Sequence, residues 1–222
     1  RRVVFMSSER PIYLKQLELG PMQNFIYLLG DPQTREAAVI DPGWEIGRVL
    51  EAAQQDGYRL TQVILTHSHF DHVLGLGELL RHADLPVHIH HTEATALDVA
   101  PSSIRMTDHG DALQIGSLPV QLIHTPGHTP GSQCLLVDGH LLSGDTLFVR
   151  ACGRWDLPGG NPRELYQSLA ERLKVLDDAT KLYPGHNYAE VPVSTIGQEK
   201  QSNPFLQPPN VADFLRLVGA PA

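Results

Sequence analysis

The sequence has only two cysteines and no long apolar run in its 222 residues. Cys134 and Cys152 are too few for the disulfide framework of a small secreted domain, and they fit a reducing compartment. No stretch approaches the ~18 consecutive apolar residues of a membrane-spanning helix, so we expect no membrane association. The apolar run within residues 1–5 is too short for a signal peptide. These absences predict a cytoplasmic protein, although the missing initiator Met leaves a processed or trimmed start open.

Lysine is also scarce, with four among seventeen basic residues, and the formal net charge is -8. A net-negative surface repels phosphate backbones, so we expect a small-molecule substrate and no nucleic-acid partner. No low-complexity segment or flexible linker divides the chain. The sequence therefore predicts a single domain over residues 1–222, with a short C-terminal tail from about residue 204. It does not indicate an oligomeric state.

Strand-like and helical segments alternate along the chain. Apolar runs bounded by Gly, Pro and Asp predict strands at 12–19, 24–29, 37–40, 63–65, 87–90, 112–115, 119–124, 133–137, 141–143 and 181–183. Helical spacing of apolar residues predicts helices at about 46–55, 72–82, 93–98, 163–176, 193–202 and 211–217. This order predicts an α/β protein, an αββα sandwich of two mixed sheets flanked by helices.

Histidines are concentrated directly after one of the buried strands. His67, His69, Asp71 and His72 lie within six residues, immediately beyond the apolar run 63–65. Imidazole and carboxylate groups suit zinc, iron or manganese, and catalytic sites leave one position open for water. Such a density of polar groups is costly without a ligand to satisfy it. We therefore interpret the cluster as a metal site in preference to a solvated histidine-rich loop.

Three further polar residues follow other apolar strands. His128, Asp145 and His186 each lie in a loop rich in Gly or Pro. Taken alone, each is more typical of a turn or a cap. Taken together they indicate one site, because the carboxyl ends of strands are where open α/β sheets build active sites.

This pattern resembles the metallo-β-lactamase superfamily, and within it the short, single-domain glyoxalase II-like (hydroxyacylglutathione hydrolase-like) branch. The resemblance implies two divalent metal ions, most readily Zn²⁺, with Fe or Mn as alternatives. The first ion would be bound by His67, His69 and His128, the second by Asp71, His72 and His186, and Asp145 would bridge both.

The resemblance also implies a reaction. A metal-bound hydroxide would attack the carbonyl of an S-acylglutathione thioester, and Asp71 would act as the catalytic residue that orients the hydroxide. A thiolate leaves without much help from a general acid. The expected function is therefore a metal-dependent thioesterase.

Substrate contacts are implied for two residues. In the resembled branch, a basic residue at the position of Arg154 and the tyrosine at the position of Tyr188 contact glutathione, which suits the planar fork of an arginine. The alternative for Arg154 is a surface ion pair. Asp156 departs from the pattern, which has an aromatic residue there. Asp41 is as consistent with a turn as with an acceptor that fixes the tautomer of a ligand histidine.

A persulfide dioxygenase on the same fold is the main alternative. It resembles this chain at residues 152–156 and 193–200, and uses one iron held by the equivalents of His67, His128 and Asp145. Residues 66–72 and 125–132 favour the hydrolase. A lactonase or other ester hydrolase is a further alternative, whereas a non-enzymatic structural metal module would need a closed ligand shell.

Overall fold

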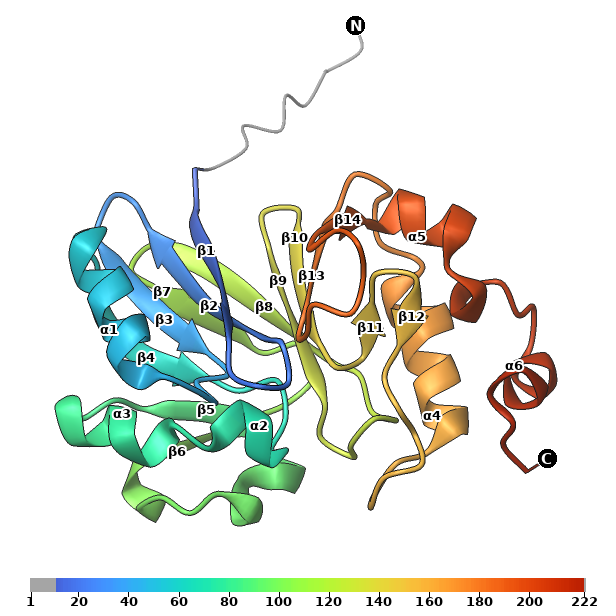
Figure 1. Ribbon diagram of the computed structural model, residues 1–222, viewed down its shortest axis with the longest axis horizontal. Coiled ribbons are helices and arrows are strands. Elements are labelled where there is room, and N and C mark those ends of the chain that lie inside the picture. Colours follow the sequence, from blue (N-terminus) through green and yellow to red (C-terminus); the bar gives the residue numbers. More distant parts are fainter. Residues whose placement is uncertain (1–10, 222) are drawn as a thin grey trace, which may run out of the picture.

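The computed structural model describes residues 11–221, so the segment 1–5, predicted not to be a signal peptide, lies outside the described residues. Two six-stranded sheets pack face to face, with helices on their outer faces (Figure 1). This arrangement confirms the predicted αββα sandwich. Within residues 11–221 no helix is both long and apolar enough to cross a membrane.

The first sheet has the order β1-β2-β3-β4-β5-β6. Its strands are β1 (Tyr13–Leu19), β2 (Asn24–Asp31), β3 (Glu36–Ile40), β4 (Arg59–Ile64), β5 (Val87–His90) and β6 (Ile104–Thr107). The first three strands pair antiparallel and the others parallel. Parallel neighbours need crossover connections. These contain α1 (Ile46–Gln55), α2 (Phe70–Val73), α3 (Leu76–His82) and the 3-10 helices η1 (His91–Ala96) and η2 (Pro101–Ser103).

The second sheet has the order β14-β13-β10-β9-β8-β7. Its strands are β7 (Ala112–Ile115), β8 (Leu118–His124), β9 (Gln133–Val137), β10 (His140–Gly144), β13 (Lys181–Pro184) and β14 (Ser194–Thr195). A hairpin of β11 (Leu147–Phe148) and β12 (Ala151–Cys152) lies between β10 and the helical segment. That segment is α4 (Pro162–Gln167) followed by the π-helical turn η3 (Ser168–Leu173).

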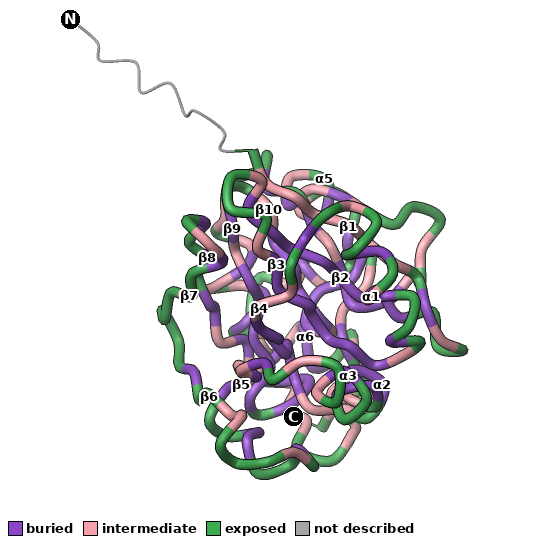
Figure 2. Tube along the Cα trace, turned by 90° about the vertical axis from the view of Figure 1, so that its left-hand side faces the viewer, coloured by how far each residue is buried: buried purple, intermediate pink, exposed green. Residues whose placement is uncertain are grey.

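Strand β2 shows how the layers are built, because all of its residues are buried. Successive side chains point to opposite faces of a strand. Phe25, Tyr27 and Leu29 therefore pack between the two sheets, while Ile26 and Leu28 pack under the helices. Figure 2 shows the same pattern, with buried strands inside and exposed helix surfaces outside.

The C-terminal residues pack on the outer face of the second sheet. α5 (Ile196–Ser202), η4 (Pro204–Leu206) and α6 (Val211–Val218) follow one another there. Phe214 is fully buried in the same apolar cluster as Leu165 and Leu169. The stretch predicted as a tail from about residue 204 is thus packed structure, and it ends in the predicted helix.

Some elements differ from the sequence prediction. The helix expected at 72–82 is divided into α2 and α3 around Gly75, where a Cβ atom would lie 2.5 Å from the Pro42 carbonyl oxygen. The backbone at position 75 lies so close to Pro42 and Ile46 that only a glycine fits there. β6 and the hairpin of β11 and β12 were not predicted, because such short strands carry little hydrophobic periodicity.

Candidate metal centre

Three histidines from two loops converge at the carboxyl ends of β4 and β8. His67 and His69 follow β4, and His128 follows β8. The His67 Nε2 atom lies 3.1 Å from His69 Nδ1, which lies 3.0 Å from His128 Nε2. Their ligand atoms all lie within 4.8 Å of one another. We call these residues the three-histidine half-site.

Asp71, His72 and His186 form a second group beside the first. Asp71 and His72 are in α2, and His186 follows β13. The His72 and His186 Nε2 atoms are 3.2 Å apart. Asp71 Oδ2 lies 3.4 Å from His72 Nε2 and 3.3 Å from His186 Nε2. We call this group, which is buried, the Asp–His–His half-site.

Asp145, just beyond β10, lies between the two half-sites. Its Oδ2 atom is 3.6 Å from His128 Nε2 and 3.3 Å from His186 Nε2, and its Oδ1 atom is 3.4 Å from His72 Nε2. A Cβ atom at Gly185 would lie 2.3 Å from Oδ1, so this approach requires glycine. The geometry brings all seven predicted ligands together.

Outer hydrogen bonds fix the tautomers of four histidines. His128 Nδ1 donates to the Arg154 carbonyl oxygen at 2.7 Å, and His186 Nδ1 to that of Met22 at 2.9 Å. A carbonyl oxygen only accepts, so Nδ1 carries a proton and Nε2 is the nitrogen that faces inward. His67 and His72 are assigned the same tautomer by the partners of their Nδ1 atoms.

Those partners are Thr66 and Asp41. Asp41 Oδ2 accepts from His72 Nδ1 at 3.0 Å and from the Thr66 hydroxyl at 2.6 Å, and the Thr66 oxygen lies 3.0 Å from His67 Nδ1. Of the two readings of Asp41, the acceptor that fixes a histidine tautomer is confirmed. One carboxylate thus orients a histidine in each half-site, as outer partners of metal ligands commonly do.

The charges of the two half-sites differ in the protein without metal. Burial, with His72 nearby, lowers the pKa of His67 well below its ordinary value, and burial also lowers the pKa of His69. Burial alone would do the same to His72, but Asp145 and Asp41 raise its pKa well above the ordinary value. Hydrogen bonds to Asp145 and Asp71 likewise outweigh burial and raise the pKa of His186 to about 9.

These residues fit a metal ion. Two nitrogens that each lie about 2.1 Å from a cation, at 90–110° to each other, are about 3.0–3.4 Å apart. The inward-facing nitrogens have this spacing, at 3.0–3.2 Å. Within residues 11–221, Asp145 Oδ1 is buried and has no hydrogen-bond partner. A buried carboxylate oxygen in that position indicates a cation as its partner.

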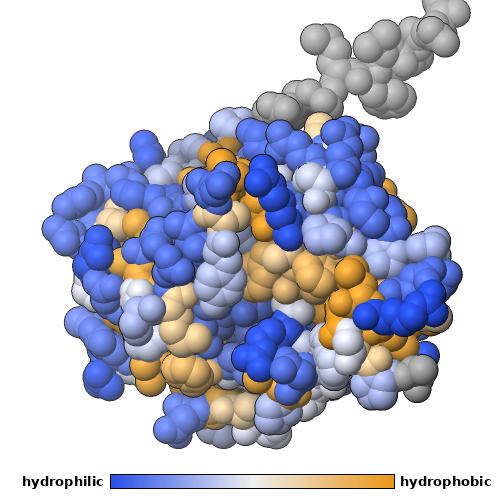
Figure 3. Space-filling view, turned by 45° about the vertical axis from the view of Figure 1, so that its right-hand side comes forward, coloured by the Kyte–Doolittle hydropathy of each residue, from blue (hydrophilic) through white to orange (hydrophobic). Residues whose placement is uncertain are grey.

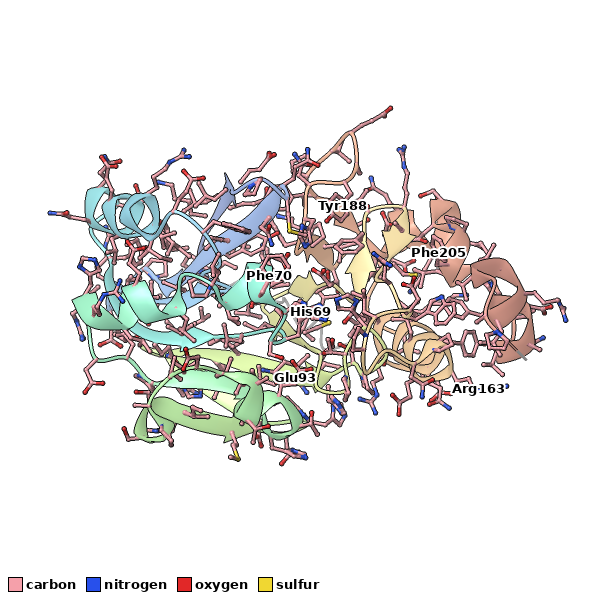
Figure 4. The ribbon with its side chains drawn as sticks, turned by 60° about the horizontal axis from the view of Figure 1, so that its bottom comes forward. His69, Phe70, Glu93, Arg163, Tyr188 and Phe205 are labelled. Atoms are coloured by element: carbon pink, nitrogen blue, oxygen red, sulfur yellow. The ribbon has the colours of Figure 1, made fainter. Side chains whose placement is uncertain are left out.

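A cavity of about 540 Å³ opens onto both half-sites. Its walls are mainly apolar, including Phe70, Phe148 and Leu157, and both predicted substrate residues, Arg154 and Tyr188, line it. Figure 4 shows His69, Phe70 and Tyr188 near one another at the middle of the molecule. The surface is largely hydrophilic with separate apolar areas (Figure 3), and Phe70 and Tyr188 are among the exposed large apolar side chains.

The two predicted substrate residues are held differently. The Tyr188 ring stacks on His186, with ring centroids 4.6 Å apart. Burial, with Asp145 and Asp71 nearby, raises the pKa of the Tyr188 phenol to about 12, so it stays protonated at neutral pH. The Arg154 guanidinium makes two 2.9 Å hydrogen bonds to Asp156. The surface ion pair considered for Arg154 is therefore present, at the edge of the cavity.

Sequence reasoning missed the residues that anchor the loops. Glu93 in η1, labelled in Figure 4, accepts from Ser68 N at 2.6 Å and from Gly131 N at 2.9 Å. These two hydrogen bonds tie the two loops of the three-histidine half-site together. Glu199 in α5 accepts from Arg150 N at 2.7 Å and so holds the hairpin that lines the cavity. Both glutamates lie far along the chain from the loops they hold, so their roles could not be read from neighbouring residues.

A second histidine cluster has a different character. His90, His91 and Asp108 bring their ligand atoms within 4.8 Å of one another. However, His90 Nδ1 accepts from Thr92 N at the start of η1, which leaves the proton on Nε2. Asp108 is also 67% exposed. His90 thus caps the start of η1, and this cluster is a capping network.

Comparison with known proteins gives the family. Residues 19–186 match the Metallo-beta-lactamase superfamily. The chain belongs to this superfamily. It therefore carries a His/Asp metal-binding site of a metal-dependent enzyme family.

Three relatives illustrate the likeness. The human mitochondrial persulfide dioxygenase ETHE1 is 35% identical over 96% of this chain and 82% of its own length. The crystal structure of ETHE1 from Myxococcus xanthus has a TM-score of 0.85 and 34% identity, covering 93% of this chain and 90% of that one. The protein TTHA1623, crystallised in a di-iron-bound form, has a TM-score of 0.74 and 34% identity, covering 86% of this chain and all of its own.

These relatives correct the expected activity. The prediction of glutathione-thioester hydrolysis was wrong, because near full-length relatives at about 35% identity are persulfide dioxygenases. The assignment to the glyoxalase II-like branch is corrected with it, while the superfamily stands. Residues 66–72 and 125–132 favoured the hydrolase, whereas residues 152–156 and 193–200 indicated the activity of these relatives.

Proposed function

We propose that this protein is a persulfide dioxygenase that works with one iron ion. The observation that carries the proposal is the 35% identity to human persulfide dioxygenase ETHE1 over 96% of the chain. One catalytic iron, in place of the pair of zinc ions expected from the sequence, would carry the reaction. A zinc thioesterase needs no redox chemistry, whereas oxidation of a sulfur by O₂ does.

The side chains for such an iron are His67, His128 and Asp145. Two histidines and one carboxylate on one face, with open positions opposite, are the ligand set of non-haem iron oxygenases. His128 and Asp145 lie 3.6 Å apart at their nearest ligand atoms, and both line the cavity. Bound iron would supply the redox chemistry by which O₂ reacts with a sulfur nucleophile.

The remaining residues of the cavity bind and orient the persulfide. Phe70, Phe148 and Leu157 provide an apolar wall that excludes water from the reacting sulfur. The protonated Tyr188 hydroxyl can donate a hydrogen bond to the substrate, and Arg154 can bind a carboxylate such as those of glutathione. One turnover would consume a persulfide, one O₂ and one water, and release a thiol and sulfurous acid.

Two assays on the same preparation test the proposal. Iron-loaded protein should take up oxygen with glutathione persulfide and should not cleave S-lactoylglutathione. His128→Ala should abolish the uptake, while His82→Ala, which changes an exposed histidine, should not alter it. Thioester cleavage by zinc-loaded protein, without oxygen uptake by the iron-loaded form, would contradict the proposal.

A further inference from the structure

The Asp71 carboxylate is held by a chain of hydrogen bonds that begins outside the metal centre. Trp44 Nε1 donates to Asn24 Oδ1 at 2.9 Å, and Asn24 Nδ2 donates to Asp71 Oδ2 at 2.9 Å. An indole N–H can only donate, so Trp44 determines which end of the Asn24 amide faces Asp71. Asn24 Nδ2 also lies 3.2 Å from the Asp71 carbonyl oxygen.

The same turn between β1 and β2 also holds His186. The Met22 carbonyl oxygen accepts from His186 Nδ1 at 2.9 Å, and Asn24 pairs with His186 in an isolated antiparallel bridge. Phe25 N donates to the Gly185 carbonyl oxygen at 2.8 Å. Residues 22–25 therefore touch two of the three members of the Asp–His–His half-site.

The three-histidine half-site takes its outer hydrogen bonds from elsewhere. His67 is oriented by Thr66, and His128 by the Arg154 carbonyl oxygen. A change in the turn between β1 and β2 should thus reach one half-site and leave the other in place.

The orientation of Asp71 matters because one oxygen serves three contacts. Its Oδ2 atom accepts from Asn24 and lies within 3.4 Å of the Nε2 atoms of both His72 and His186. Without the amide, this oxygen keeps only its contacts with the two histidines, so the carboxylate can rotate more readily about its Cβ–Cγ bond. Loss of such an outer partner typically weakens metal binding about 10–100-fold.

We propose that Trp44 and Asn24 are positioning residues that fix the Asp71 carboxylate and so set the affinity of the Asp–His–His half-site for a second divalent cation. The first cation, at the three-histidine half-site, is unaffected by them. The proposal concerns cation binding alone and does not depend on persulfide oxidation.

Calorimetric titration of the metal-free protein with Zn²⁺ alone provides the test. The unaltered chain should take up two equivalents. Asn24→Ala should weaken the second equivalent about 10–100-fold and leave the first unchanged. Asn24→Asp keeps an acceptor for Trp44 but replaces the amide donor with a second carboxylate, so it should weaken the second equivalent at least as much. Trp44→Phe, which retains an aromatic ring and loses the N–H, should have a smaller effect in the same direction.

A matched control is Gln62→Ala. Gln62 is also a buried amide, and its Nε2 atom donates to the Gln114 carbonyl oxygen at 2.8 Å, away from the metal centre. Both equivalents should bind to this variant as they do to the unaltered chain. Equal weakening of both equivalents in the Asn24 variants, an unchanged second equivalent, or uptake of one equivalent by the unaltered chain would each overturn the proposal. If the Asn24 variants do not fold, the affinity of Trp44→Phe for the second equivalent tests the proposal in their place.

Discussion

The three-histidine half-site and the Asp–His–His half-site share Asp145 but are held and charged in different ways. His67 and His69 have lowered pKa values, so their imidazole rings are neutral at neutral pH and each can donate an electron pair to a metal ion. His72 and His186 have raised pKa values, because carboxylates surround them. The Asp–His–His half-site can therefore hold its geometry through its own ion pairs, whereas the imidazoles of the three-histidine half-site have Asp145 as their nearby counter-charge.

This difference favours the three-histidine half-site, together with Asp145, as the place of the proposed iron. His67 and His128 with the Asp145 carboxylate match the two-histidine, one-carboxylate ligand set of a non-haem iron centre. The three-histidine half-site is also the more open of the two, since His69 is half-buried, whereas Asp71, His72 and His186 are buried.

The largest effect is expected from Asp145→Ala, because it removes the group that the half-sites share. Both cations should bind at least 100-fold more weakly, beyond the roughly 10–100-fold loss caused by outer partners, and oxygen uptake should cease. Metal content after dialysis and oxygen uptake would be measured, with Asp84→Ala, an exposed aspartate on the surface, as the control. Retention of either cation at its original affinity would show that Asp145 does not join the two half-sites.

A pair of histidine variants separates the half-sites. His128→Ala should remove the first cation and the activity, because it takes one of three nitrogens from the three-histidine half-site. His186→Ala should spare the first cation and lower oxygen uptake less than His128→Ala does. Metal stoichiometry and oxygen uptake would be compared side by side. Equal loss at both half-sites in the His186 variant would contradict the assignment.

The structure brings together the predicted ligands that follow strands directly. His67, His128 and His186 each come within a few residues of a strand end, so the topology alone brings them together. The partners that orient them could not be predicted in this way. Asn24 lies 47 residues from Asp71, and only the antiparallel return of β2 beside the metal centre makes them neighbours.

The ligand motif also could not predict which reaction the metal centre catalyses. The same seven residues can serve a hydrolase or an oxygenase, because the side chains fix where a metal lies and leave its identity open. The segments that distinguish the two, residues 152–156 and 193–200, carry no metal ligand. In the structure, residues 152–156 continue from the last residue of the cavity hairpin, and residues 193–200 include Glu199, which holds that hairpin.

The Asp31 carboxylate lies outside both half-sites. Its replacement should therefore change the stability of the fold and leave metal binding unchanged. Hydrogen bonds from Ser117 and Gln33 outweigh burial and lower the pKa of Asp31 to about 2. A lowered pKa means that this stabilisation is complete above the ordinary value near 4 and is lost as pH falls towards 2. Asp31→Asn should lower the free energy of unfolding by about 1 kcal/mol at neutral pH, since a neutral amide oxygen accepts these hydrogen bonds more weakly than a carboxylate does. Urea denaturation at pH 7 would measure this, and altered metal affinity would count against the separation of roles.

The smallest effect is expected at the edge of the cavity. Asp156→Asn releases Arg154 from an exposed ion pair, so the guanidinium becomes free for a substrate carboxylate. The KM for glutathione persulfide should fall by a few-fold, with kcat and metal content unchanged. A rise in KM would indicate instead that Asp156 holds Arg154 in its binding position.

Titration of iron into the metal-free protein, followed by oxygen uptake with glutathione persulfide, tests the central claim most directly. If the three-histidine half-site together with Asp145 carries the reaction, the rate should rise linearly and reach its maximum at one iron per chain. A rate that stays low until a second equivalent has bound, or no uptake at any iron content, would contradict the account.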